Sequence, residues 1–131
     1  MLKKSQKVAI YMEGHIYSEY GKMGMGVLRY LENKIVCVID KKYSNTDVSD
    51  HYSNLKSVPV VHDLESAIKL GAQVLILGIA PSGGKVPPDW YPIIKMALSK
   101  GLSIINGLHD LLQDRFSNLI SKKNQWIWDV R

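Results

Sequence analysis

Two glycine-containing segments carry the residues best suited to binding an anion. The first follows an apolar run and places Gly14, Gly21, Lys22 and Gly24 before and at the start of a predicted helix. Free N–H groups at a helix start, together with a lysine, favour negatively charged groups. The G-x-G-x-x-G fingerprint of dinucleotide-binding proteins is absent, because Gly24-x-Gly26 is not followed by a third glycine. An anion site and a loop whose glycines serve only turns and packing both remain open.

The second segment is Pro81-Ser82-Gly83-Gly84-Lys85, between the most hydrophobic run of the chain and a predicted helix. Paired glycines can turn successive N–H groups toward an oxyanion. The segment differs from a phosphate-binding P-loop, G-x-x-x-x-G-K-[ST], because Ile79 stands where the first glycine belongs and Val86 replaces the Ser or Thr. We expect ligand contact here; a purely structural turn is the alternative.

An acidic residue, Asp40, ends the second β-rich run. Rossmann proteins place an acid at this point to contact the ribose hydroxyls. Lys41 and Lys42 follow directly and could instead face a phosphate. An aspartate that merely begins a polar loop is an equally good interpretation.

Histidines follow two of the runs. His109, in Asn106-Gly107-Leu108-His109, and His15, beside Glu13, could act in acid–base chemistry or contact a ligand oxygen, or could simply orient neighbouring elements. His51 and His62 have no partner at a useful spacing in the sequence. Without H-x-x-x-H or C-x-x-C we expect no metal site, and the absence of G-x-S-x-G excludes a hydrolase elbow.

Short apolar runs alternate with helical patterns along the whole chain. We expect strands at residues 8–12, 35–39, 58–61, 74–77, 102–105 and 126–130. We expect helices at residues 23–31, 64–70 after an Asp63 cap, from Asp89 as the cap to about residue 100, 108–112 and 116–122, with a loop over 41–57. Pro59 favours an edge position for the third strand.

This alternation predicts an α/β, Rossmann-like, doubly wound parallel sheet of about six strands in the order 3-2-1-4-5-6. In such a sheet ligands bind beyond the carboxyl ends of the strands, where the first and fourth strands diverge. Both glycine segments follow those two strands. We therefore expect them to meet at one crevice.

Composition sets the class of protein. The chain has 131 residues, 46% hydrophobic and 22% charged, with a formal net charge of +5, so we expect one domain over residues 1–131. The lysines are scattered rather than gathered in a basic stripe, which argues against a nucleic-acid partner. Cys37, the only cysteine, lies in an apolar run and is expected to be buried and inert. Without a signal peptide or a membrane-length run, we expect a cytoplasmic protein.

Several segments in order resemble one protein family. They include Gly78-Ile79-Ala80-Pro81-Ser82-Gly83-Gly84, Asn106-Gly107-Leu108-His109 and Ile127-Trp128-Asp129-Val130-Arg131. The resemblance is to the Rossmann-like N-terminal domain of a bacterial and archaeal family long of unknown function. Some of its members are described as D-glutamate N-acetyltransferases, and others are labelled NAD-dependent epimerase/dehydratases. It implies that a P-loop domain, in cis or in trans, completes the enzyme.

The sequence leaves three hypotheses for the function of the chain. The first is a domain that binds a small anionic ligand, acetyl-CoA or an adenine nucleotide, within an enzyme that transfers an acyl group to an acidic amino acid such as D-glutamate. The second is an NAD-dependent oxidoreductase, which the missing fingerprint makes a weaker hypothesis. The third is an interaction or dimerisation module that uses Trp126 and Trp128 on the last strand, giving a homo-oligomer. No catalytic residue is assigned.

Overall fold

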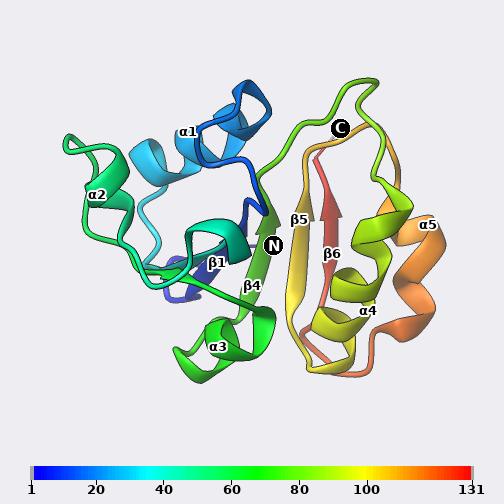
Figure 1. Cartoon of the computed structure of the whole chain (residues 1–131). Helices are drawn as coiled ribbons and strands as arrows, with labels where there is room; N and C mark the ends of the chain where they lie inside the picture. Colours follow the sequence, from blue (N-terminus) through cyan, green and yellow to red (C-terminus); the bar gives the residue numbers. More distant parts are fainter. Residues whose placement is uncertain (1, 131) are drawn as a thin grey trace.

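The computed structural model of the protein describes residues 2–130, and within them six strands form one sheet. The order is β3-β2-β1-β4-β5-β6 and every neighbouring pair is parallel, which confirms the predicted fold class. In Figure 1 the arrows of β4 and β6 point toward the top, where the loop after β4 rises. The strands are β1 (Val8–Tyr11), β2 (Ile35–Ile39), β3 (Val60–Val61), β4 (Val74–Leu77), β5 (Ser103–Asn106) and β6 (Ile127–Asp129).

Strand position follows hydrophobicity. β1 and β4 are buried along their whole length and pair with each other at the centre, from Val8 opposite Val74 to Tyr11 opposite Leu77. Continuous apolar runs are typical of strands covered on both faces. Pro59, which cannot donate a ladder hydrogen bond, directly precedes β3 at one edge of the sheet, as predicted.

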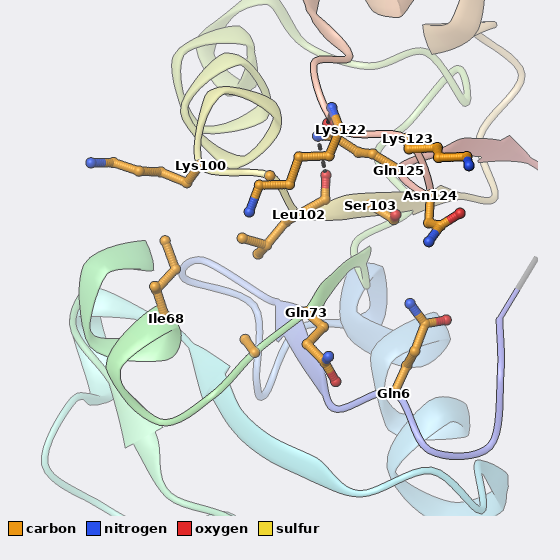
Figure 2. A pocket seen from close by; sticks show the side chains of 12 residues that line it. Gln6, Ile68, Gln73, Lys100, Leu102, Ser103, Lys122, Lys123, Asn124 and Gln125 are labelled. Atoms are coloured by element: carbon orange, nitrogen blue, oxygen red, sulfur yellow. Dashed lines mark hydrogen bonds between the residues drawn. The ribbon is translucent and has the colours of Figure 1, made fainter.

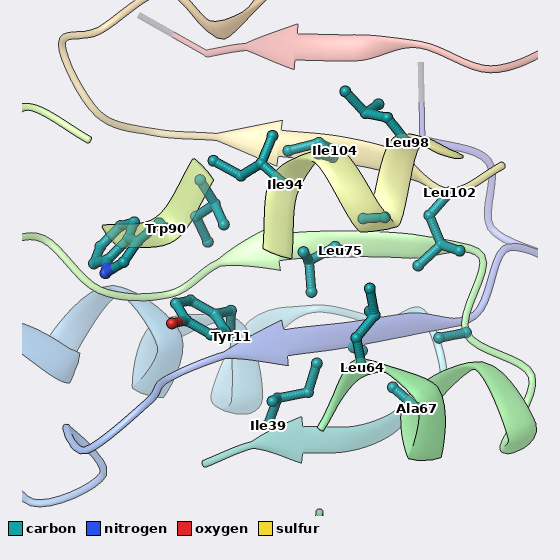
Figure 3. Close-up of a cluster of buried hydrophobic side chains, with 14 of the residues drawn as sticks. Tyr11, Ile39, Leu64, Ala67, Leu75, Trp90, Ile94, Leu98, Leu102 and Ile104 are labelled. Atoms are coloured by element: carbon teal, nitrogen blue, oxygen red, sulfur yellow. The ribbon is translucent and has the colours of Figure 1, made fainter. Parts of the chain in front are cut away.

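Helices cover both faces. α1 (Lys22–Tyr30) and α2 (Val48–His51) pack on one face, where Leu28 and Val48 belong to the same buried cluster as Val8 and Ile10. The other face carries α3 (Leu64–Lys69), α4 (Tyr91–Ser99) and α5 (Leu112–Phe116). Figure 3 shows this second core, in which α3 and α4 side chains meet residues of β1, β2, β4 and β5. The described part of the chain also contains four 3-10 turns: Glu19–Gly21, Lys41–Tyr43, Pro88–Trp90 and Ser117–Leu119.

Some predicted boundaries are wrong for identifiable reasons. The expected loop at 41–57 contains α2, because Asp47 and Asp50 form a reciprocal capping box. Asp89 lies within a 3-10 turn and does not cap α4, which begins at Tyr91. Asp63 does cap α3, accepting from the Ser66 N–H at 2.8 Å.

The carboxyl-terminal third also differs from the prediction. The helices expected at 108–112 and 116–122 are replaced by α5 and the turn at Ser117–Leu119, and the last strand spans Ile127–Asp129. Cys37 is fully buried, as expected, and burial raises the pKa of its thiol to about 12. Across residues 2–130, no helix combines the length and apolar character that crossing a membrane requires. Arg131, part of the terminal motif, lies outside the described residues.

Candidate functional site

The loops after the strands gather at the carboxyl rim of the sheet, which is the candidate site. The first loop is fastened to the end of β2 by two carboxylates. Asp40 Oδ1 accepts from the Gly14 N–H at 2.9 Å, and Glu13 Oε1 accepts from the Lys41 N–H at 2.9 Å. Gly14 has φ +76°, a conformation that glycine adopts without strain. The positions of Glu13 and Gly14 therefore depend on residues 26 or more places away in the chain.

Asp40 is buried rather than presented to a ligand. Its side chain is 0% exposed, and Oδ1 also accepts from the Lys42 N–H at 3.1 Å. Its second oxygen, Oδ2, has no hydrogen-bond partner among the described residues. Leaving a buried carboxylate oxygen without a donor is costly, so a nearby hydroxyl or water would be stabilising.

The loops that carry the two glycine segments are joined at this rim, next to the ends of β1 and β4. The Gly24 N–H donates to the Gly78 carbonyl at 2.9 Å, and the Ala80 N–H donates to the Tyr20 carbonyl at 2.8 Å. These bonds join the start of α1 to the loop that follows β4. The point where β1 and β4 diverge is therefore bridged by backbone.

Most of the glycine N–H groups in these segments are already used. Gly21 donates to the Ser18 carbonyl and Gly84 to the Pro81 carbonyl, in addition to the bonds made by Gly14 and Gly24. A Cβ at Gly21 would meet the His15 carbonyl, and one at Gly24 would lie 2.6 Å from Met12 Sδ. These glycines allow close packing, and the Met12 side chain fills the space where we expected a crevice.

The tip of the second loop is more open. Ser82 and Gly83 are exposed, and Gly83 and Gly84 have consecutive positive φ angles of 86° and 72°. The Gly83 N–H has no acceptor within residues 2–130. Lys85 and, at the start of α1, Lys22 are exposed cations on the same rim. The tip can therefore offer one N–H donor to an anion.

His109 lies directly against the second loop. Its N–H donates to the Gly84 carbonyl at 2.8 Å, and its ring occupies the space that a side chain at Gly84 would need. The structure thus brings together Gly84 and His109, two candidates far apart in the sequence.

The neighbouring Asn106 and Asp129 have structural roles. Asn106 is buried and its Nδ2 donates to Asp129 Oδ1 at 2.8 Å, while Asp129 accepts the N–H groups of Leu112 and Gln113 at the start of α5. These bonds explain the presence of Asn106 and Asp129 by their roles in the fold, and neither residue needs a ligand to account for it.

An open groove of about 410 Å³ lies beside the bridged point, between α3 and α4. Glu13, Lys41, His62 and Asp63 supply its polar margin. Burial, followed by the charges of Glu13, Asp89 and Asp40, raises the pKa of Tyr11 to about 12, so its hydroxyl stays neutral in the groove wall. The apolar part of the lining consists of Tyr11, Ile39, Leu64, Pro92, Ile93 and Met96.

Sequence reasoning missed a second polar cluster on the α2 side of the rim. The Tyr17 hydroxyl is hydrogen-bonded to His51 Nδ1, and His51 Nε2 lies 2.9 Å from Thr46 Oγ1. Thr46 donates its single proton to the Tyr43 carbonyl, so it accepts from Nε2–H and the Tyr17 hydroxyl donates to Nδ1. His51 therefore has hydrogen-bond partners that the spacing of residues in the sequence did not reveal.

The part of the chain that the structure describes, residues 2–130, contains no group of three or more metal-binding side chains.

Comparisons with known proteins agree with this architecture. Residues 41–131 match the family described as a domain of unknown function (DUF1611_N), Rossmann-like domain. A crystal structure of a duf1611 family protein from Anabaena variabilis superposes with a TM-score of 0.91 and 38% identity, over 97% of this chain and 37% of that one.

Two curated relatives match over shorter segments. D-glutamate N-acetyltransferases from Pseudoalteromonas sp and Tritonibacter scottomollicae are 43% and 41% identical over 67 and 51 residues. The matches cover 50% and 39% of this chain but only 20% and 15% of those enzymes.

Proposed function

Because the chain belongs to the Rossmann-like DUF1611_N family, we propose that it is the ligand-binding N-terminal part of an N-acetyltransferase that acts on an acidic amino acid such as D-glutamate. In this proposal the groove between α3 and α4 binds the adenosine part of acetyl-CoA or of an adenine nucleotide. The match to named D-glutamate N-acetyltransferases supports the reaction class. The small share of those enzymes that is covered supports a further domain or subunit, such as a P-loop domain, that supplies the remaining machinery.

The chemistry of the groove carries the proposal. Its wall joins an aromatic ring, Tyr11, to the aliphatic side chains of Ile39 and Met96, a surface on which a flat base can pack. Glu13, at the margin, can accept hydrogen bonds from ribose hydroxyls. Lys41 and His62 stand at the same margin, where they can attract phosphate.

Glu13 replaces Asp40 as the residue that we expect to contact ribose. Asp40 follows β2, as the acid of a Rossmann protein does, but its complete burial keeps it from a ligand in this conformation. We propose that Asp40 is a positioning residue that holds Gly14 and thereby Glu13. The Gly83 N–H, Lys22 and Lys85 remain for a phosphate or for the carboxylates of the acyl acceptor.

Calorimetric titration of the full chain with acetyl-CoA, ADP, NAD and D-glutamate tests the proposal. We expect acetyl-CoA or ADP to bind, and Met96→Glu to weaken that binding about tenfold by placing a charge against the base. Leu111→Glu is the matched control, because Leu111 is similarly exposed (45% against 41%) and lies outside the groove. Absence of binding by all four compounds, or equal effects of the two variants, would contradict the proposed site. Binding by NAD alone would favour the oxidoreductase hypothesis instead.

A further inference from the structure

The amino rim of the sheet, opposite the candidate site, is strongly basic. The segments that precede β1, β4, β5 and β6 at this rim contain no acidic residue: 2–7, 70–73, 100–102 and 120–126. The lysines that precede strands or end helices there include Lys7, Lys34, Lys56, Lys69, Lys100 and Lys122. Lysines at helix ends are expected from the helix dipole, but those that precede strands are not.

A groove of about 410 Å³ opens within this basic rim, between the ends of α3 and α4. Lys100, Lys122 and Lys123 are among its lining residues, and no carboxylate is. Figure 2 shows Lys122 reaching over the gap, with Gln6 and Gln73 on the opposite wall. An adjoining hollow of about 320 Å³ shares Gln6 and Lys123 with it.

The glutamines of the groove are oriented by the backbone. Gln6 Oε1 accepts from the Lys3 N–H and Gln73 Oε1 from the Lys7 N–H, each at 2.9 Å. Their amide NH₂ groups have no acceptor among the described residues. The acceptor ends are thus occupied, and donors remain for a ligand.

The helix carbonyls that would repel an anion are covered. At the end of α4, Gln125 Nε2 donates to the carbonyls of Leu98 and Leu102, at 2.8 and 2.7 Å. At the end of α3, the Ala67 carbonyl accepts from the N–H groups of Leu70 and Ala72. Several of the last carbonyls of both helices are therefore bonded within the protein, which reduces the negative potential that they direct at the groove.

We propose that this groove at the amino rim is a second binding site, for a compact anion with three or more negative charges. Lys122 reaches over the gap, Lys100 and Lys123 stand at its two margins, and no carboxylate lines it. With the two free amides, this arrangement matches the charge and the acceptors of a pyrophosphate group or a small tricarboxylate. The site lies at the opposite rim of the sheet from the groove proposed for the adenosine part. Its ligand is therefore distinct from the one that the proposed function requires.

The test is titration of the isotope-labelled full chain with pyrophosphate and with citrate, followed by amide NMR at low and at physiological ionic strength. We expect saturable shifts for Gln73, Gly101 and the Gln125 side chain. The variant Lys122→Gln/Lys123→Gln should weaken binding about tenfold or more, because it removes two charge-assisted donors. Its control, Lys56→Gln/Lys95→Gln, removes the same charge from outside the groove and should change affinity less than about twofold.

The two anions identify the source of the charge. Tighter binding of pyrophosphate indicates a phosphate ligand, and tighter binding of citrate indicates a carboxylate ligand; either result supports the site. Shifts that do not saturate, or equal weakening in the two double variants, would show diffuse attraction to the basic rim and overturn the proposal.

Discussion

Asp40 shows how one buried residue can fix the position of a distant loop. Its single bonded oxygen holds the Gly14 and Lys42 N–H groups, while Glu13 in the same loop reaches the groove. At this scale, burial decides which acid is available for chemistry.

Cys37 gives a prediction about alkaline pH. Burial raises the pKa of its thiol from 9.0 to about 12 in the folded chain, so between these values the unfolded thiol loses its proton and the folded one keeps it. The contribution of the protonated Cys37 thiol to the free energy of unfolding is thus fully present below pH 9.0 and is lost as the pH rises toward 12. We expect the free energy of unfolding to fall with a slope approaching about 1.4 kcal/mol per pH unit from this group.

Urea unfolding at several values above pH 9 checks this, with Cys37→Val as the comparison. The variant lacks the thiol and should show a shallower decline. Identical slopes for the two proteins would show that the thiol is not protected by burial. Iodoacetamide should label Cys37 only after unfolding.

Two glycines of α1, Gly24 and Gly26, have different surroundings. Gly24, in α1, lies against Met12 and donates to Gly78, so α1 and the end of β4 approach closely. Gly26, two residues later in the same helix, has no atom within 4 Å of its would-be Cβ. Alanine at these two positions therefore compares a crowded site with an open site in the same helix.

Alanine substitutions should separate these roles. Gly26→Ala should stabilise the protein by up to about 1 kcal/mol, because alanine is the better helix former. Gly24→Ala should destabilise it by about 1–3 kcal/mol, since a Cβ would lie 2.6 Å from Met12 Sδ in a packed core. Thermal unfolding measures both changes. A stabilised Gly24→Ala protein would indicate that Met12 moves freely and that the space above β1 can open for a ligand.

At the scale of the whole molecule, the sheet separates two rims of different chemistry. The carboxyl rim combines carboxylates, histidines and an apolar groove, whereas the amino rim is lined by lysines and amides. Parallel strands make this separation possible, because all of them end at the same rim.

Local stability should decrease from the central strands of the sheet to its edge strands, and hydrogen exchange should report this difference. Amides of β1 and β4, which are fully buried at the centre, should exchange most slowly, and those of the short edge strands β3 and β6 faster. NMR exchange on the full chain measures this directly. Protection of β6 equal to that of β1 would indicate that another copy or partner covers the edge near Trp126 and Trp128.

The order of apolar runs and helical patterns was sufficient to predict the sheet, its strand order and the rim at which the loops after β1 and β4 lie, because these depend on local periodicity and on the handedness of crossovers. The cap at Asp63 and the burial of Cys37 were local properties too. Only the tertiary structure decided that Glu13 rather than Asp40 reaches the groove, that Met12 fills the space beside Gly24, and that His51 meets Tyr17. These outcomes depend on contacts between residues distant in sequence, where packing and hydrogen-bond geometry, rather than local pattern, determine which atoms remain free.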